Sequence, residues 1–203
     1  MILGLDHLAL DHLALAAETL EAGVAHAEAA LGLPLAGGGA HALMGTHNRL
    51  LGLGDLYFEV IAIDPSAPKP PHARWFDLDH FRGPPRLTNW ICRADLRHAP
   101  PEAGRVLDVA RGDLRWRMAV PESGVLPMGG TYPALIEWLG DRHPTQRLPD
   151  SGARLALLEI ATPDPAALRA ALPGFADPRV QFSQGAPDFR ATFDTPHGRR
   201  VLT

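Results

Sequence analysis

Four polar side chains interrupt apolar stretches of this sequence at nearly regular spacing. His12 lies in LDHLALA, Glu59 in LYFEVIAI, Asn89 in LTNWIC and Glu137 in ALIEWL. His12 and Glu59 are 47 residues apart, and Asn89 and Glu137 are 48 residues apart. Imidazole and carboxylate groups transfer protons and bind divalent ions. The repeat therefore predicts one polar site that two similar halves of the chain build together.

A second histidine competes with His12. The sequence LDHLA occurs twice in succession, at 5–9 and at 10–14, so His7 stands in the same local context. We favour His12, because only its copy stands at the distance from the following helix that lets the strand end and turn. Alternation along this strand predicts that His12 shares a face with Leu10 and that Asp11 points to the opposite face.

Strand and helix patterns around these residues predict an α+β fold. A helix is expected at 19–31, with Thr19 as its N-cap and Gly32 at its end. The cluster Gly37–Gly39 is typical of a turn or loop. Strands are expected at 10–16, 47–53, 56–63, 87–92, 113–120 and 134–139, and a weak helix at 103–110. The chain therefore divides into one module at 10–63 and another at 87–139.

Two further segments complete the organisation. Residues 64–86 contain six prolines, which exclude a central strand or a long helix, and the large apolar pair Trp75-Phe76. We expect this linker to fold back as a lid. Residues 153–203 predict an additional β-α-β-β unit, with Asp164 as N-cap and Pro165 at the first helical position.

Composition excludes several classes of partner. The formal net charge is −4, which offers no basic surface for nucleic acid or an anionic membrane. No apolar run approaches the length that spans a bilayer, and the N-terminus has no signal-peptide pattern. The single cysteine, Cys92, lies in an apolar strand pattern and fits a buried thiol in a reducing compartment. We expect a cytoplasmic protein with a small-molecule substrate, and a homodimer is an open alternative.

With these positions defined, the chain resembles the glyoxalase-like domain proteins of the vicinal-oxygen-chelate superfamily. The motifs that carry the resemblance are LDHLALAAETLEAGVAHAEAALG (10–32), GGGAHALMGTHNRLLGLGDLYFEVIAIDP (37–65), LTNWICRADL (87–96) and LPMGGTYPALIEW (126–138). The resemblance implies paired β-α-β-β-β modules that curl into a cup, with a metal ligand on the first and last strand of each module. The four ligand positions fall on His12, Glu59, Asn89 and Glu137, and Asn89 stands where the family more often has histidine.

The residues support two functions. Two carboxylates and one imidazole that converge in a cup require a divalent ion or a protonated carboxyl group, and this donor set suits Mg²⁺ or Mn²⁺. The leading hypothesis is a metal-assisted lyase or isomerase acting on a small carbonyl metabolite, with metal ligands His12, Glu59 and Glu137. Glu59 or Glu137 would be the catalytic base. The alternatives are a metal-free protein that sequesters a small molecule and a relic of the fold that serves as a dimer module. Residues expected to contact the substrate are Asn48, Asn89, Trp90 and Trp138.

Overall fold

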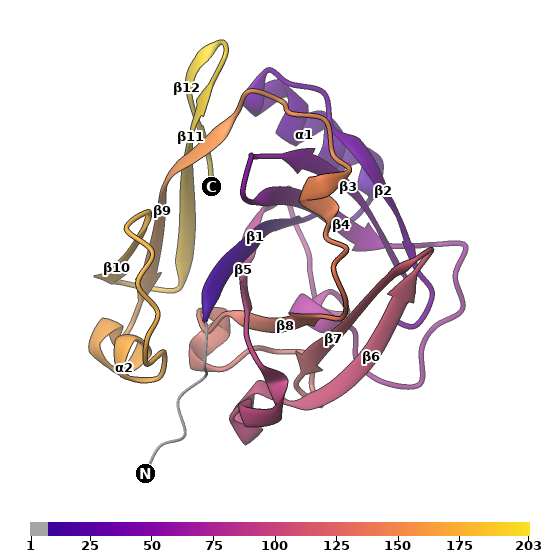
Figure 1. Ribbon diagram of the computed structural model, residues 1–203, viewed down its shortest axis with the longest axis vertical. Coiled ribbons are helices and arrows are strands. Elements are labelled where there is room, and N and C mark those ends of the chain that lie inside the picture. Colours follow the sequence, from indigo (N-terminus) through magenta and orange to yellow (C-terminus); the bar gives the residue numbers. More distant parts are fainter. Residues whose placement is uncertain (1–7) are drawn as a thin grey trace.

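The computed structural model describes residues 8–203, which form one strongly curled sheet and one small sheet (Figure 1). The large sheet has eight strands in the order β2-β3-β4-β1-β5-β8-β7-β6. Its strands are β1 (Ala9–Ala16), β2 (Ala36–His41), β3 (Thr46–Gly52), β4 (Tyr57–Ile63), β5 (Arg86–Arg93), β6 (Arg105–Arg111), β7 (Leu114–Val120) and β8 (Ala134–Trp138). This is the predicted α+β fold with a curved-sheet cup. His7 lies outside the described residues.

The large sheet consists of two similar halves. β1 pairs parallel with β4, β5 pairs parallel with β8, and β1 and β5 pair antiparallel at the centre. The group β2-β3-β4-β1 is therefore repeated as β6-β7-β8-β5. The curl brings the two edge strands, β2 and β6, into contact with each other.

The helix α1 (Leu20–Leu31) follows β1 as predicted. The Thr19 side chain accepts a hydrogen bond from the Ala22 amide at 3.2 Å, and Gly32 ends the helix in the left-handed conformation with φ 70°. The helix packs closely on β4, because a Cβ atom at Gly23 would stand only 2.6 Å from a methyl group of Val60. The first half is thus a β-α-β-β-β module.

Two predictions about secondary structure were wrong. The glycine cluster belongs to β2 and is not a turn; its three residues have positive φ values, and the pairing of β2 with β3 shifts register between Ala36 and Gly39. Residues 103–110 are not helical, because 105–111 form β6, which pairs with β7 along its whole length. The second module has only short 3-10 turns, Leu96–His98 and Pro101–Ala103, in place of the helix.

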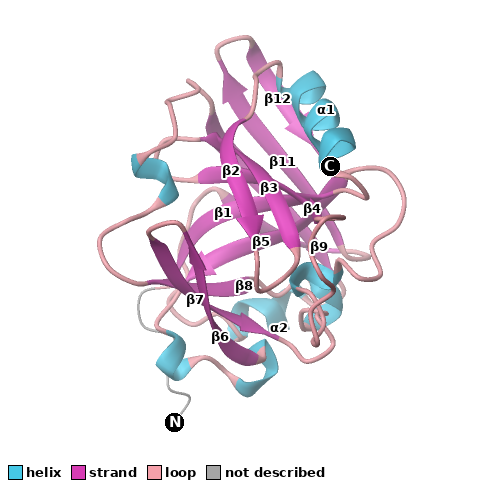
Figure 2. Cartoon of the chain, turned by 90° about the vertical axis from the view of Figure 1, so that its right-hand side faces the viewer, coloured by secondary structure: helices cyan, strands magenta, loops and turns pink. Residues whose placement is uncertain are grey.

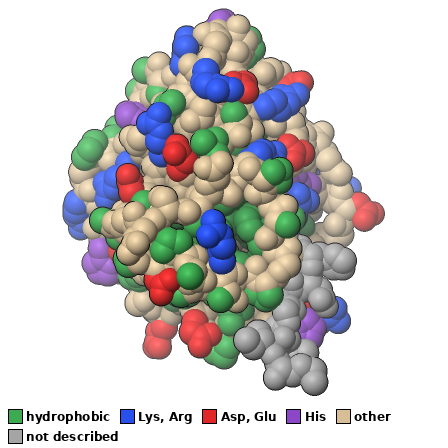
Figure 3. Space-filling model, turned by 90° about the vertical axis from the view of Figure 1, so that its left-hand side faces the viewer, with side chains coloured by type: hydrophobic (Ala, Val, Ile, Leu, Met, Phe, Trp, Pro, Cys, Tyr) green, Lys and Arg blue, Asp and Glu red, His purple; other side chains and the backbone are tan. Residues whose placement is uncertain are grey.

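The C-terminal unit forms the small sheet. It contains β9 (Arg154–Thr162), α2 (Pro165–Ala170), β10 (Val180–Gln184), β11 (Asp188–Thr195) and β12 (Gly198–Leu202), in the strand order β10-β9-β11-β12. Asp164 caps α2 by accepting from the Ala167 amide, as predicted. One strand more follows the helix than the β-α-β-β pattern contains. On the face that this sheet presents, acidic and basic side chains are interspersed (Figure 3).

The large sheet separates two apolar cores. One core lies between the large sheet, α1 and the small sheet, and contains Leu13, Leu31 and Phe193. The other lies inside the cup and contains Ala14 and residues of segment 64–86. Figure 2 shows the strands of the cup with α1 on one side. Leu13 and Ala14 are neighbours on β1 but lie in different cores. One face of this strand therefore points into the cup, where it can line a site. Within residues 8–203, no helix is long and apolar enough to cross a membrane.

Candidate functional site

A small cavity lies inside the cup, and we call it the cup cavity. Its polar wall residues are His12, His41, Asn48, Glu59 and Arg111. Aromatic rings and two aliphatic side chains complete the wall: Tyr57, Trp75, Phe76, Trp116, Trp138, Met118 and Ile136. The volume is about 30 Å³, enough for one or two water molecules. The cavity therefore holds several ionisable groups in apolar surroundings, which is typical of a site that tunes their chemistry.

A β-bulge places Asp11 beside His12. The pairing of β1 with β5 shifts register between Leu10 and His12, so Asp11 is the extra residue of the bulge. Leu10 lies with Leu13 in the core between the large sheet, α1 and the small sheet. Asp11 and His12 are both turned toward the cup. The prediction that His12 shares a face with Leu10, opposite Asp11, was therefore wrong. Simple alternation holds only where the strand has no extra residue.

Asp11 is a fully buried carboxylate with several donors. It accepts hydrogen bonds from His12 Nδ1 at 2.6 Å and Trp138 Nε1 at 3.1 Å, and it contacts His143 Nε2 at 3.0 Å and Arg93 Nε at 3.1 Å. Burial alone would raise the pKa of Asp11, but the hydrogen bonds from the two histidines outweigh it and lower the pKa. Asp11 therefore stays ionised and fixes the orientation of the His12 ring.

His12 and Glu59 face each other across the cavity. The distance from His12 Nε2 to Glu59 Oε2 is 3.6 Å, and Glu59 Oε1 accepts a hydrogen bond from Asn48 Nδ2 at 2.5 Å. Burial opposes ionisation of both groups, but Asp11 and Glu59 raise the pKa of His12, and His12 lowers the pKa of Glu59. The Tyr57 ring stacks on the imidazole at 4.2 Å. Each group thus favours the charged form of the other, the protonated imidazole and the ionised carboxylate.

Arg111 reaches into the cavity from β6 and bridges the two edges of the curled sheet. Its Nη1 donates to Asn48 Oδ1 at 2.9 Å and to His41 Nε2 at 3.1 Å. An arginine can only donate, so His41 Nε2 is unprotonated and its Nδ1 donates to Thr46 Oγ1 at 3.0 Å. Burial, the largest influence, lowers the pKa of His41 to about 4, which agrees with a neutral ring.

The carboxylates near the cavity have cationic partners within the protein itself. Asp11 contacts Arg93 at 3.1 Å, and Asp11 and Glu59 raise the pKa of His12. Arg111 brings a further positive charge to the cavity wall. A divalent ion or a protonated carboxyl group was expected because only the acids and one neutral imidazole are evident in the sequence pattern.

The structure brings some of the predicted site residues together and separates others. His12, Asn48, Glu59 and Trp138 line the cup cavity. Asn89 is buried on β5 and its Oδ1 has no hydrogen-bond partner among the described residues, but it does not line the cavity.

Trp90 and Glu137 lie outside the cup cavity. Trp90 lies in the core between the large and small sheets. There its Nε1 donates to the Thr131 carbonyl at 2.9 Å and its ring contacts Phe175. A role in substrate binding does not fit that position. Glu137 pairs with Arg117 at 3.5 Å, has a partly exposed side chain and does not line the cup cavity.

The position of Glu137 follows from the spacing of the repeat. Ile136, which stands 47 residues after Asn89, lines the cavity on β8. The spacing of 48 is one residue longer than that of His12 and Glu59, and a slip of one residue moves a side chain to the other face of a strand. The repeat was real, but its fourth member is Ile136 and not Glu137.

The residues present do not fit the predicted metal site. Glu137 is separated from His12 and Glu59, and His41 Nε2 already accepts from Arg111. Across residues 8–203, no three or more His, Cys, Asp or Glu side chains are grouped so that they could hold a metal ion.

Segment 64–86 forms part of the wall of the cup cavity. Trp75 and Phe76 lie in the cavity wall, on the 3-10 turn Trp75–Asp77. Phe76 and Asp77 both adopt positive φ values, 60° and 53°, which are costly for residues with a side chain. The buried Arg74 holds the turn through Asp79 at 2.6 Å. The lid that was expected from the Trp75-Phe76 pair is thus a strained, anchored wall of the cavity.

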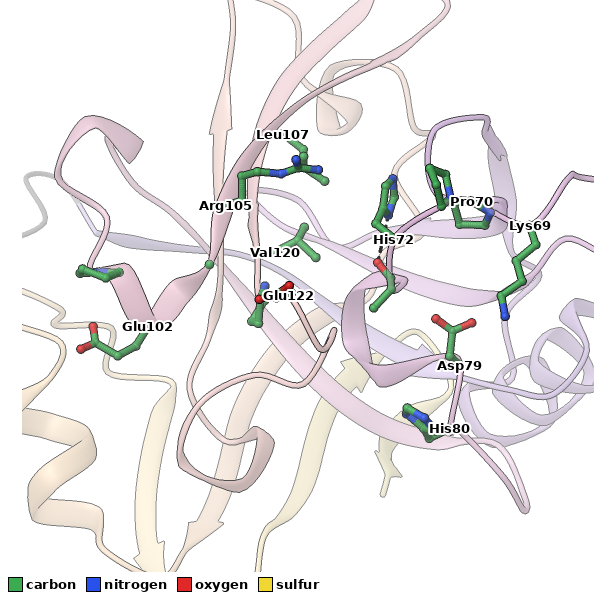
Figure 4. A pocket seen from close by; sticks show the side chains of 15 residues that line it. Lys69, Pro70, His72, Asp79, His80, Glu102, Arg105, Leu107, Val120 and Glu122 are labelled. Carbon is green, nitrogen blue, oxygen red and sulfur yellow. Dashed lines mark hydrogen bonds between the residues drawn. The ribbon is translucent and has the colours of Figure 1, made fainter.

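A second, larger hollow of about 940 Å³ lies outside the cup, between the lid segment and the start of β6 (Figure 4). Arg105 extends across it toward His72, and Lys69 lies on the same side as Asp79. Asp79 already pairs with Arg74, and acidic and basic groups alternate around the hollow. No hydrogen-bonded pair of an imidazole and a carboxylate like that of His12 and Asp11 joins two of its described lining residues, so the cup cavity remains the candidate site.

Comparison with known proteins agrees with this architecture. The family model for the glyoxalase-like domain matches residues 10–175. The chain belongs to the glyoxalase-like domain family. Its resemblance to this family, predicted from the motifs, is confirmed. No curated protein matches the sequence of this glyoxalase-like protein.

Comparison with solved structures finds similarity at low sequence identity. A hypothetical protein from Staphylococcus aureus is 11% identical, with a TM-score of 0.62 over 89% of this chain and 88% of that chain. Methylmalonyl-CoA epimerase from Mycobacterium tuberculosis is 20% identical, with a TM-score of 0.44 over 66% of this chain and 88% of that one. The first of these likenesses shows the fold of the glyoxalase-like protein and nothing about its substrate.

Sequence reasoning missed three polar residues near the cavity. Asp11 was assigned to the wrong face because a bulge leaves no mark in the alternation of apolar residues. Arg111 was missed because 103–110 was taken as helical, although Gly112-Asp113 repeats the Gly-Asp turn signal seen at 54–55 and marks a hairpin. His41 was missed because no strand was expected at 36–41, and only the pairing of β2 with β3 brings it to the cavity.

Proposed function

We propose that this protein is a small-molecule enzyme that moves a proton at a carbon atom next to a carbonyl group. The observation that carries the proposal is the pair formed by His12 and Glu59, with 3.6 Å between Nε2 and Oε2 inside the cup cavity. One group holds a proton and the other can accept one. An acid and a base in one cavity are the minimum equipment for isomerase or lyase chemistry of this kind.

Each polar neighbour has a defined part in this chemistry. Glu59 is the base, and the hydrogen bond from Asn48 to Oε1 leaves Oε2 facing the cavity. His12 is the acid that returns a proton, and Asp11 holds its Nδ1 so that Nε2 points toward Glu59. Asp11 is therefore a positioning residue. The aromatic walls make the surroundings of these groups less polar, which strengthens electrostatic interactions in the cavity.

Sequestration of a small apolar compound is the second candidate function. Five aromatic rings line the cavity, and such walls suit a flat apolar ligand without any reaction. The two candidates differ in one respect: only the enzyme needs an ionised Glu59. A binding protein would retain its ligand when Glu59 becomes neutral.

Exchange of carbon-bound hydrogen with deuterated water tests the proposal. The probes are 4-phenyl-2-oxobutanoate and benzylacetone, which share a phenyl ring and a CH2 group next to a carbonyl. We expect the wild-type protein to accelerate exchange at that CH2 group, as measured by proton NMR. Glu59→Gln should reduce exchange to the uncatalysed rate, because an amide cannot take the proton. Glu137→Gln is the matched control, since it makes the same change outside the cup, and it should leave the rate unchanged.

Two results would contradict the proposal. The first is exchange that is equal for Glu59→Gln and the wild type. The second is the absence of any acceleration by the wild type while both probes bind, which would favour sequestration.

A further inference from the structure

We propose that Arg111 is the substrate-binding residue of the cup and that it selects small 2-oxo acids by holding their carboxylate group. The proposal deepens the proposed function and rests on it for the location of the site. Arg111 would supply the positive charge that was expected from a divalent ion.

The hydrogen bonds of Arg111 leave part of its guanidinium group available. Nη1 donates to Asn48 Oδ1 and His41 Nε2, which uses both of its hydrogens. A guanidinium group has five N–H donors, so three remain on Nε and Nη2. Within residues 8–203, neither of these atoms has a hydrogen-bond partner, and Arg111 lines the cavity. A fixed guanidinium group with free donors matches a carboxylate in size and geometry.

The edge strand β2 is shaped to let Arg111 pass. A Cβ atom at Gly39 would stand 3.2 Å from Arg111 Cδ, and the Gly39 φ angle is 153°. The Gly39 amide also donates to Asn48 Oδ1 at 2.9 Å, so the acceptor of Arg111 is itself held in place. The glycine cluster and Asn48 therefore fix Arg111 against the opposite edge of the sheet. Such support is what a preorganised binding group needs.

A second donor in the wall lacks an acceptor. Trp75 is 4% exposed, and its Nε1 has no hydrogen-bond partner among the described residues. Buried N–H groups without partners are uncommon and are costly to leave unsatisfied. A ligand with several oxygen atoms would supply acceptors for Trp75 and for Arg111 together. A purely apolar ligand would supply none.

The same arrangement accounts for the proton transfer of a 2-oxo acid. Glu59 takes a proton from the carbon next to the carbonyl, the C–H electrons form a carbon–carbon double bond, and the carbonyl electrons move to oxygen. The donors of Arg111 stabilise this oxygen as it gains negative charge. His12 or protonated Glu59 then returns a proton to carbon. No oxidant or further reactant takes part, so the step balances within the ligand and these side chains.

Such a ligand exceeds the present cavity of about 30 Å³, so it has to displace part of the wall. We expect Trp75-Phe76 to move, because Phe76 is strained at φ 60° and the anchoring pair Arg74–Asp79 flanks these two residues without including them. Binding would then expose the buried indole of Trp75 to the ligand, which gives a fluorescence signal.

Binding of a matched pair of probes tests the assignment. The probe 4-phenyl-2-oxobutanoate carries a carboxylate where benzylacetone carries a methyl group, and affinities are measured by calorimetry and tryptophan fluorescence. Arg111→Met should weaken binding of the acid by about 10- to 100-fold, the range for hydrogen bonds to charged groups. It should leave binding of benzylacetone unchanged. Arg111→Lys, which keeps the charge but not the fork, should recover part of the affinity. Arg190→Met removes an exposed arginine of the small sheet and should change neither affinity.

The results separate this proposal from the proposed function. Equal loss of both probes in Arg111→Met would show a structural role and overturn the proposal, as would unchanged affinity for the acid or no binding of the acid to the wild type. Selective loss of the acid supports the proposal even if the wild type catalyses no exchange, and in that case only the proposed function fails. If the wild type catalyses exchange but Arg111→Met binds the acid as tightly as the wild type, the proposed function stands and the proposed role of Arg111 fails.

Discussion

Replacement of Asp11 by asparagine should destabilise the protein and disorder the site at the same time. The carboxylate has no exposed surface and faces three ring N–H donors, from His12, Trp138 and His143. Asparagine has nearly the same shape, but one oxygen becomes an NH2 group. At least one N–H donor would then face another donor inside the protein.

The magnitude follows from the burial of this group. Breaking a buried ion pair by removal of one partner costs about 3–5 kcal/mol. Asparagine keeps one acceptor oxygen, so we expect a loss of about 2–4 kcal/mol in the free energy of unfolding. For a chain of this length, that corresponds to a fall of roughly 5–15 °C in Tm. Asp194→Asn, at an exposed pair with Arg199 in the small sheet, is the matched control and should change Tm by less than about 2 °C.

The stabilising contributions of Asp11 and His12 should change with pH in opposite directions. The folded-state pKa of Asp11 lies below its ordinary value of 3.8, so its contribution is present above that value and is lost as the pH falls through the folded pKa. His12 has a raised pKa, so its contribution is present below 6.5 and is lost as the pH rises through the folded pKa. Urea unfolding of wild type and variant from pH 3 to 8 measures both effects. A variant within 1 kcal/mol of the wild type at pH 6 would refute the reasoning about Asp11.

Three further substitutions test the local physics. Gly23→Ala should cost about 1–3 kcal/mol, because the new methyl group would stand 2.6 Å from Val60, and thermal unfolding measures this loss; an unchanged Tm would mean that α1 can shift away from β4. Thr19→Ala removes the N-cap of α1 and should cost about 1 kcal/mol in urea unfolding, whereas Thr19→Ser should restore stability. Trp138→Phe keeps a ring but removes a donor to Asp11, so we expect a loss of about 1–2 kcal/mol and slower exchange of the 2-oxo acid; full activity would show that Asp11 needs no indole partner.

Local signals predicted the parts of the fold that depend on neighbouring residues. Thr19 and Gly32 fixed both ends of α1, and Asp164 and Pro165 fixed the start of α2, because caps act within one turn of helix. The apolar run of β4 identified a buried strand around Glu59. These features need no knowledge of what lies across the sheet.

Features set by pairing between distant strands escaped the prediction. The bulge at Asp11 exists only relative to β5, and the face of Glu137 depends on one residue of register in β8. Arg111 reaches the cavity because the sheet curls until β6 meets β2, which no local pattern encodes. The pair His12 and Glu59 was predicted because both lie on strands whose central position the apolar pattern made plain.

The ionisation of His12 in the wild-type protein tests the central claim most directly. Proton and nitrogen NMR of the imidazole ring, followed from pH 5 to 9, reports both its charge and the proton on each nitrogen. The account predicts a protonated ring at pH 7, with a pKa above 6.5 that falls in Glu59→Gln and stays unchanged in Glu137→Gln. A neutral ring at pH 7, or a pKa that does not respond to Glu59, would contradict it.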